Sequence, residues 1–209
     1  MFKVGITDGY LKFKKVVIYR MQEIRFHGRG GQGTVVAAIL LSKAFFQDGY
    51  WVQSFPAFGV ERRGAPVEAY LRIDTQKILA RYAITQPDHV LVQDKRLMHT
   101  VNVTQGLKPG GWVLLNAPPG ADDVQGLPDF RLATVDASQI ASDNDLGTRT
   151  HPIVNTAMIG AFARVLGIPP IAAVTAAIQK NMHAKTDANA SAAQEAYDSV
   201  KVKYDKSML

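Results

Sequence analysis

Four glycines within six positions mark the stretch of this chain whose residue types best suit ligand binding. They lie in Glu23 to Thr34, EIRFHGRGGQGT, where a short apolar run precedes the glycines and a long apolar segment follows them. This order predicts a strand, a tight turn and the start of a helix, because glycine adopts positive φ and lets other groups approach the backbone closely. A helix that opens from such a turn presents free N–H groups and the positive end of its dipole, so it can hold an anion.

The glycine spacing also fits the dinucleotide-binding fingerprint, with Gly28, Gly30 and Gly33 in G-x-G-x-x-G. That fingerprint requires an Asp or Glu about 20 residues later, at the end of the second strand, to hold the ribose hydroxyls. The stretch from Val52 to Phe55 offers no carboxylate. Three interpretations remain: a dinucleotide site, a turn that only permits close packing, or an anion or cofactor phosphate held jointly with another subunit. A Walker-type phosphate loop is excluded, because the residue before the threonine is not lysine.

A second unusual stretch is FPAFGVERRGAPV, in which Glu61, Arg62 and Arg63 follow apolar residues in what should be a loop. Adjacent arginines bind carboxylates and phosphates through charge-assisted, often bidentate hydrogen bonds. Glu61 could pair internally with one arginine while the aromatic residues pack on the core. Alternatively, the stretch contacts another subunit, or a ligand at a subunit junction.

The rest of the sequence contains no catalytic constellation that we can recognise. His27 lies beside the glycine turn and could line a pocket, whereas the other four histidines are scattered without metal-ligand spacing and are expected to be structural or on the surface: His89, His99, His151 and His183. No serine lies in a G-x-S-x-G elbow, and no paired carboxylates are evident at strand ends. We therefore expect no catalytic residue and no metal site in this chain.

Composition limits the class of protein. The 209 residues are 47% hydrophobic and 20% charged, as in ordinary globular proteins. The formal net charge is +6, but residues 1–20 carry five cations against one carboxylate, a net charge of +4, so the remainder carries about +2. We expect neither nucleic-acid binding nor a membrane span. Cysteine is absent, which excludes disulfides and cysteine-ligated zinc or iron–sulfur clusters and favours a cytoplasmic protein.

Hydrophobic periodicity and turn residues place the secondary structure. Strands are predicted at 23–28, 50–55, 67–73, 88–93, 112–115 and 130–135, and helices at 34–47, 95–105, 155–166, 171–179 and 187–203. The helix at 34–47 is apolar nearly all round, so it should be buried against a sheet or a partner. Alternating strands and helices predict a Rossmann-like, doubly wound α/β fold: a mostly parallel sheet with helices on both faces and a helical C-terminal third. The strand at 67–73 closely follows its predecessor and could be antiparallel.

Two domain-level predictions follow. Residues 1–20 form an N-terminal extension that makes a poor signal peptide. Residues 21–209 form a single domain, because their number is enough for one sizeable core.

Two motifs together resemble a known family. The sequence is similar to the gamma subunits of 2-oxoacid:ferredoxin (acceptor) oxidoreductases, of the pyruvate:ferredoxin oxidoreductase type, in G-R-G-G-Q-G at 28–33 and F-P-x-F-G-x-E-R-R-G-A-P-V at 55–67. The later stretches PDHVLVQD, GGWVLLN and NTAMIGAFARVLG also resemble that family. The likeness covers residues 22–205, leaves out residues 1–20, and is much more specific than a lone G-x-G-x-x-G.

The resemblance implies a subunit of a heteromultimeric enzyme that oxidatively decarboxylates a 2-oxoacid to an acyl-CoA and passes electrons to ferredoxin or another acceptor. Pyruvate is the expected substrate, and an aryl 2-oxoacid is an alternative. Thiamine diphosphate, Mg and iron–sulfur clusters would be held by alpha, beta and delta (ferredoxin-like) subunits, and none by this chain alone. The gamma domain of the family packs beside the active-site subunits and is expected to contribute to the coenzyme A pocket. The candidate cofactor-binding residues are Gly28, Gly30, Gly31, Gln32, Gly33, Thr34, Glu61, Arg62, Arg63 and Gly64.

A stand-alone Rossmann-like dinucleotide-binding oxidoreductase or regulator is the rival hypothesis. It rests on the G-x-G-x-x-G match alone and predicts tight dinucleotide binding by the isolated chain.

Overall fold

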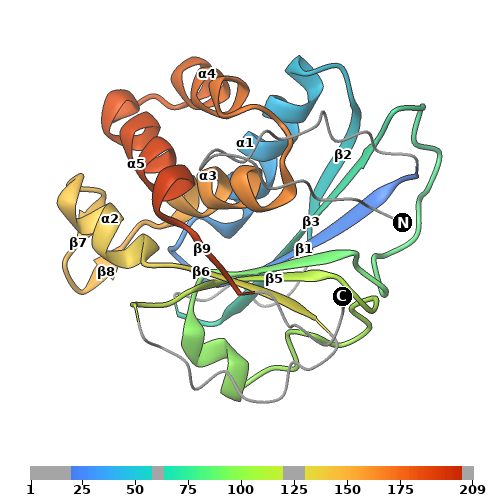
Figure 1. Cartoon of the computed structure of the whole chain (residues 1–209), viewed down its shortest axis with the longest axis horizontal. Coiled ribbons are helices and arrows are strands. Elements are labelled where there is room, and N and C mark those ends of the chain that lie inside the picture. The colour runs from blue at the N-terminus through green and yellow to red at the C-terminus, as the bar shows by residue number, and fades with distance from the viewer. Residues whose placement is uncertain (1–19, 58–63, 120–129, 204–209) are drawn as a thin grey trace, which may run out of the picture.

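A computed structural model describes residues 20–57, 64–119 and 130–203 (Figure 1). The predicted extension at 1–20 lies outside these residues except for Arg20, so the division into an extension and a domain at 21–209 stays a prediction. Of the second motif, Glu61, Arg62 and Arg63 also lie outside the described residues.

Strands and helices alternate along most of the chain, as the sequence predicts. The elements are β1 (Gln22–Arg29), α1 (Thr34–Gln47), β2 (Trp51–Pro56), β3 (Pro66–Asp74), β4 (His89–Val92), η1 (Lys95–His99), β5 (Trp112–Asn116), β6 (Arg131–Val135), α2 (Ala137–Asp143), β7 (Gly147–Thr148), β8 (His151–Pro152), α3 (Asn155–Leu166), α4 (Ile171–Asn181), α5 (Thr186–Ser199) and β9 (Lys201–Lys203). Helices α1 and α3 begin and end where the sequence predicts them, and glycines mark the start of α1 at Gly33 and the end of α3 at Gly167.

The main sheet has seven strands in the order β2-β3-β1-β4-β5-β6-β9. Strands β1, β4, β5 and β6 are parallel neighbours, whereas β3 and β9 are antiparallel to theirs. Five of the seven strands therefore point the same way, and the predicted mostly parallel sheet is confirmed. Strand β3 is the antiparallel element that the sequence suggested, and it lies between β1 and β2.

The two faces of the sheet are covered differently. Helices α1, α3, α4 and α5 gather on one face in Figure 1, and their apolar side chains form the larger core cluster with that face. The opposite face carries η1 and the following loop, which bury Leu97, Val103 and Leu107. The α/β fold and the helical C-terminal third are confirmed. On the second face of the sheet, the described residues supply only one helix, the 3-10 helix η1.

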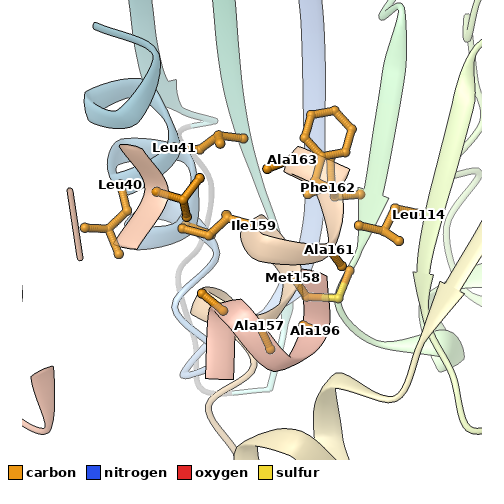
Figure 2. Close-up of a cluster of buried hydrophobic side chains, with 14 of the residues drawn as sticks. Leu40, Leu41, Leu114, Ala157, Met158, Ile159, Ala161, Phe162, Ala163 and Ala196 are labelled. Atoms are coloured by element: carbon orange, nitrogen blue, oxygen red, sulfur yellow. The ribbon is translucent and has the colours of Figure 1, made fainter. Parts of the chain in front are cut away.

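The larger core is built mainly by α1 and α3. Figure 2 shows Leu40 and Leu41 of α1 near Ile159 of α3, and Phe162 of α3 belongs to the same cluster as Leu114 of β5. All of these side chains are at most 2% exposed. None of the helices in the described ranges is long and apolar enough to span a bilayer.

Three element predictions need correction. The helix predicted at 95–105 is only the 3-10 helix Lys95–His99, because a series of turns and Gly106, with φ of 71°, follow it. The last helix ends at Ser199, because Val200 turns extended and Val202 joins β9 against β6. The sequence analysis did not predict α2 or the β7–β8 hairpin, because these elements are too short to show periodicity.

Helix α1 is buried on one face and exposed on another. Its inner face is closely packed, but Val36, Ile39 and Phe46 are 41%, 40% and 66% exposed. The predicted packing of α1 against the sheet is confirmed for this inner face, and a second apolar face of α1 is left at the surface of this chain.

Candidate functional site

The glycine turn joins the end of β1 to the start of α1. Gly31 and Gly33 both have positive φ, 96° and 74°, so the turn uses conformations that favour glycine. Gln32 closes the turn, since its backbone N–H donates to the Arg29 carbonyl at 3.0 Å and its side-chain Oε1 accepts from the Arg29 N–H at 2.8 Å. The N-terminus of α1 thus lies at the carboxyl end of a parallel strand, where ligands commonly bind in α/β proteins.

The two sequence motifs are in direct contact. Gly30 donates its N–H to the Ala65 carbonyl at 2.9 Å, and Gly64 donates back to the Gly30 carbonyl at 3.1 Å. The guanidinium of Arg29 also donates to the Gly64 carbonyl at 3.1 Å. The glycine turn and the chain that leads into β3 therefore form one surface.

A cavity of about 760 Å³ opens beside this surface. It lies at the carboxyl ends of β1, β4, β5 and β6, with the β7–β8 hairpin on its far side. Its lining residues are Arg29, Gly30, Gly31, Gln32, Gly64, Gln93, Asp94, Lys95, Arg96, Asn116, Pro118, Asp136, Ser138, Thr150, His151 and Pro152. Four of the predicted site residues are thus brought together here: Gly30, Gly31, Gln32 and Gly64.

Three other predicted residues lie behind the cavity wall and have packing roles. A Cβ on Gly28 would lie 2.0 Å from Thr34 Oγ1 and 2.5 Å from Gln93 Oε1. A Cβ on Gly33 would lie 2.6 Å from Asn155 Nδ2. Thr34 is buried, and its hydroxyl donates to Gln93 Oε1 at 2.7 Å. These two glycines are explained by close approach, whether or not a ligand binds.

The wall of the cavity carries an ion-paired cluster. Asp94 Oδ2 lies 2.9 Å from Arg29 Nε, and the Asp94 carboxylate accepts from Arg96 Nε at 3.0 Å and Arg96 Nη2 at 2.8 Å. Burial works to raise the pKa of Asp94, but the hydrogen bonds and charge of Arg96, with Arg29, outweigh it and lower that pKa. Asp94 therefore stays ionised and holds both guanidiniums at the cavity.

A buried amide forms the floor. Gln93 is fully buried, and its carbonyl accepts from Asn116 Nδ2 at 2.9 Å, which also donates to Ser138 Oγ at 2.9 Å. The Gln93 Nε2 donor has no hydrogen-bond partner within the described part of the chain. An unpaired buried donor is costly. Gln93, which lines the cavity, thus keeps one buried donor without a partner in the described residues.

One histidine, His27, differs from the suggested pocket position. His27 does not line this cavity: it is 2% exposed, and its Nε2 accepts from Arg25 Nε at 3.0 Å. Burial lowers its pKa to about 4, although the nearby Glu68 carboxylate acts in the opposite direction. His89 is likewise buried, as expected of a structural histidine, and its pKa is lowered to about 4 by burial. The sequence placed His151 among structural or surface residues, and it is exposed at the cavity rim.

Sequence reasoning missed the residues that neighbouring strands contribute. Asp94 follows β4, Asn116 ends β5, and Asp136 follows β6, so polar side chains converge at one edge of the sheet. Two carboxylates, Asp94 and Asp136, thus line one cavity, although Asp94 is paired with arginines rather than with another carboxylate. A usable signal was present, because polar residues directly after consecutive parallel strands meet at the same edge. The described residues contain no group of three or more carboxylates and histidines suited to a metal.

Comparison with known proteins identifies the relatives of the chain. A family model described as pyruvate ferredoxin/flavodoxin oxidoreductase matches residues 23–199. The pyruvate synthase subunit PorC of Methanocaldococcus jannaschii is 51% identical over 185 residues, covering 88% of this chain and 99% of that protein. The pyruvate/ketoisovalerate oxidoreductases common subunit gamma of Pyrococcus abyssi is 46% identical, over 87% and 98%. The crystal structure of the pyruvate oxidoreductase subunit PORC of Thermotoga maritima is similar with a TM-score of 0.72 at 33% identity, covering 88% of this chain and 99% of that one.

Proposed function

Because the chain belongs to the pyruvate ferredoxin/flavodoxin oxidoreductase family as a gamma-type subunit, we propose that it acts in a complex that oxidatively decarboxylates pyruvate or a similar 2-oxoacid. The complex forms an acyl-CoA and passes electrons to ferredoxin or another acceptor. Alpha, beta and delta partners hold thiamine diphosphate, Mg and the iron–sulfur clusters. Since the chain has no cysteine, it cannot supply the thiolates that such clusters require.

We assign to this chain the binding of the phosphate-bearing part of coenzyme A. The observation that carries this assignment is the cavity at the carboxyl ends of the parallel strands, with the glycine turn on one side and Arg29 and Arg96 on its wall. Guanidiniums and a helix N-terminus suit phosphate oxygens. When bound, coenzyme A supplies the thiol that accepts the acyl group.

The residues of the cavity fit such a group in three respects. The Gly30–Gln32 turn places backbone at the wall without side-chain bulk. Arg96 has a side chain that is 77% exposed, so it can reach a ligand while Asp94 orients it. Gln93 Nε2 offers a buried donor to an acceptor at the floor. Arg62 and Arg63 belong to the same proposal by sequence, because their segment rejoins the described chain at Gly64, on the cavity wall.

We do not assign selection of the 2-oxoacid to this chain. The relative from Pyrococcus abyssi is named as a subunit common to pyruvate and ketoisovalerate oxidoreductases, so one gamma chain there works with two substrates. That name supports a similar division of labour here, in which the partners recognise the substrate.

Co-expression with the alpha, beta and delta partners tests the proposed function. The four chains should co-purify and reduce ferredoxin or a viologen dye in a pyruvate- and CoA-dependent reaction, and omission of this chain should abolish or strongly reduce it. If this chain, co-expressed with the other three, purified free of them, that result would contradict the proposal. Calorimetry of the isolated chain with NAD tests the rival hypothesis of a stand-alone dinucleotide-binding protein.

The coenzyme A assignment has its own test. Arg96→Ala should raise the KM for CoA roughly tenfold or more, the scale of a lost hydrogen bond to a charged group, with kcat and assembly unchanged. Arg81→Ala is the matched control, because Arg81 is exposed and does not line the cavity. An unchanged KM would place the phosphates elsewhere. Arg62→Ala and Arg63→Ala should behave like Arg96→Ala, whereas loss of assembly would identify them as interface residues.

A further inference from the structure

The exposed apolar side chains gather around one edge of the sheet. Among the described residues, seven large hydrophobic side chains are exposed, and six of them lie on α1, on β2 or in the loop after β3: Val36, Ile39, Phe46, Trp51, Leu79 and Tyr82. Apolar residues exposed singly are normal, whereas these six lie on elements that flank the same edge of the sheet. We call these six residues the β2-edge patch.

Hydrogen bonds hold the loop part of this patch against β2 and β3. Gln53 of β2 donates to the Ala80 carbonyl at 3.1 Å, and Arg72 of β3 donates to the Tyr82 carbonyl at 2.6 Å. The Arg72 guanidinium also lies 4.6 Å from the centre of the Tyr82 ring. The loop is therefore fixed on one side of the edge, while Val36, Ile39 and Phe46 of α1 lie on the other.

Strand β2 itself is an unprotected edge. It ends the sheet, pairs with β3 on one side and pairs with no other described strand. Its sequence, WVQSFP, carries no charge, whereas β9 at the opposite edge reads KVK. Natural proteins protect free edges with lysine and other charges, because an uncharged edge strand pairs readily with another chain. The lysines of β9 give that protection, whereas β2 has no charge and only one protecting residue, Pro56 at its end.

We propose that β2 pairs antiparallel with β2 of a second copy of this chain across a twofold axis, joining the two sheets. The axis stands perpendicular to the sheet, so that α1 meets α1 of the second copy on one face and the 79–82 loops approach each other on the other face. An antiparallel edge complements itself, because the outward-facing N–H and C=O groups of one copy, such as those of Val52 and Ser54, can meet the same groups of the other. The pairing thus needs no residue from a different protein.

The exposed area is on the scale that a dimer requires. With ~150–250 Å² for each aromatic side chain and less for the aliphatic ones, the exposed fractions of the patch amount to roughly 600 Å² of apolar surface. A standard interface buries about 800 Å² per partner, and the backbone and flanking atoms of β2 supply the difference.

This edge is compatible with the cavity described above. Helix α1 runs from the cavity end of the sheet to the far end, and β2 starts there with Trp51, five residues after Phe46. Antiparallel pairing places this far end of one copy beside the Pro56 end of β2 in the second copy. In each copy, however, β3 separates β2 from β1, the nearest strand that carries the cavity. Two gamma chains can therefore pair without contact between the strands that carry the cavities, so the pairing does not depend on the coenzyme A assignment.

Sedimentation velocity over a concentration series tests the pairing. The isolated chain should form a dimer, and Phe46→Glu and Trp51→Lys should each raise the dimer dissociation constant at least about tenfold. Ile153→Lys is the matched control, because Ile153 is the seventh exposed hydrophobic side chain, 37% exposed, and lies outside the patch. It should leave the dimer unchanged. All three positions are exposed, so an unchanged far-UV circular dichroism spectrum will confirm that the variants fold.

Cysteine cross-linking tests the register in the assembled complex. The chain has no cysteine, so single cysteines at Val52, Gln53 and Ser54 can report only on the introduced site. At least one of the three should give a covalent gamma–gamma dimer on mild oxidation, since a disulfide requires Cα atoms about 4.4–6.8 Å apart. A chain that stays monomeric, or a dimer that none of the three cysteines cross-links, would overturn the proposal. Loss of the dimer on Ile153→Lys but not on Trp51→Lys would do the same.

Discussion

Replacing Gly28 by alanine separates the packing role of the glycine turn from its ligand-binding role. The new Cβ would lie 2.0 Å from Thr34 Oγ1, 2.5 Å from Gln93 Oε1 and 3.3 Å from Thr34 Cβ. Rotation of the threonine hydroxyl relieves the first contact but breaks its 2.7 Å hydrogen bond to Gln93. Because Gln93 is fully buried, its Oε1 would then be left without a donor.

The expected cost combines two effects. An unsatisfied buried acceptor costs about 1–3 kcal/mol, and forcing a methyl group into a closely packed site costs about 1–3 kcal/mol. Because relaxation of the threonine reduces the second effect, we expect Gly28→Ala to lower the free energy of unfolding by roughly 2–4 kcal/mol. Urea denaturation of the isolated chain, followed by far-UV circular dichroism, measures this without any ligand.

A double-mutant cycle identifies the cause. Thr34→Ala removes the same hydrogen bond, so the double variant Gly28→Ala/Thr34→Ala should be destabilised by less than the sum of the single variants, by at least ~1 kcal/mol. Gly31→Ala is the contrasting control: nothing lies within 4 Å of its Cβ position and its φ is 96°, so only backbone strain of ~1–2 kcal/mol applies. A Gly28→Ala variant as stable as the parent chain, or additive effects in the cycle, would refute the packing explanation.

Two further predictions concern buried ionisable groups. The pKa values of His27 and His89 are lowered to about 4 by burial, so between pH ~6.5 and ~4 the unfolded chain binds protons that the folded chain does not. The free energy of unfolding should therefore fall by a few kcal/mol as the pH drops through this range, and it should stay constant just above the range. Urea titrations at a series of pH values measure this. His89→Gln should reduce the dependence of the unfolding free energy on pH. Arg72 is 1% exposed and donates to Glu23, Gln53 and the Tyr82 carbonyl. Arg72→Leu leaves the Glu23 carboxylate buried without its main partner, so the unfolding free energy should fall by about 3–5 kcal/mol. A variant as stable as the parent chain would contradict this and show that Lys108, which also lies near Glu23, is a sufficient partner for the carboxylate.

The long elements could be predicted because local signals mark them. Helix α1 starts after the glycine turn, and α3 ends at Gly167, whose φ is 78°. The short elements depend on tertiary contacts instead. Strand β9 exists because three residues after α5 find an open edge of β6, and α2 is one short helix capped by Asp136. No periodicity within such short segments could have distinguished them from turns.

The candidate site was predictable only in the part that is contiguous in sequence. Gly30, Gly31, Gln32 and Gly64 line the cavity, but the polar side chains opposite them come from β4, β5 and β6. Their convergence follows from the strand order, which the sequence does not state. In contrast, Gly28 and Gly33 looked like ligand residues, although their backbone is crowded by Gln93 and Asn155.

The topology also explains why the second strand carries no carboxylate. In a dinucleotide-binding sheet the second strand lies beside the first, so an acidic residue at its end reaches the ribose of a ligand on the glycine turn. Here β3 lies between β1 and β2, which places β2 roughly 10 Å from β1 at the ~4.8 Å spacing of neighbouring strands. A carboxylate after β2 would be too far away to act as it does in that fold. Asp94 and Asp136, after β4 and β6, are the carboxylates that share a cavity with the turn. The glycine fingerprint therefore stands in a sheet whose strand order is incompatible with the dinucleotide geometry that the fingerprint usually indicates.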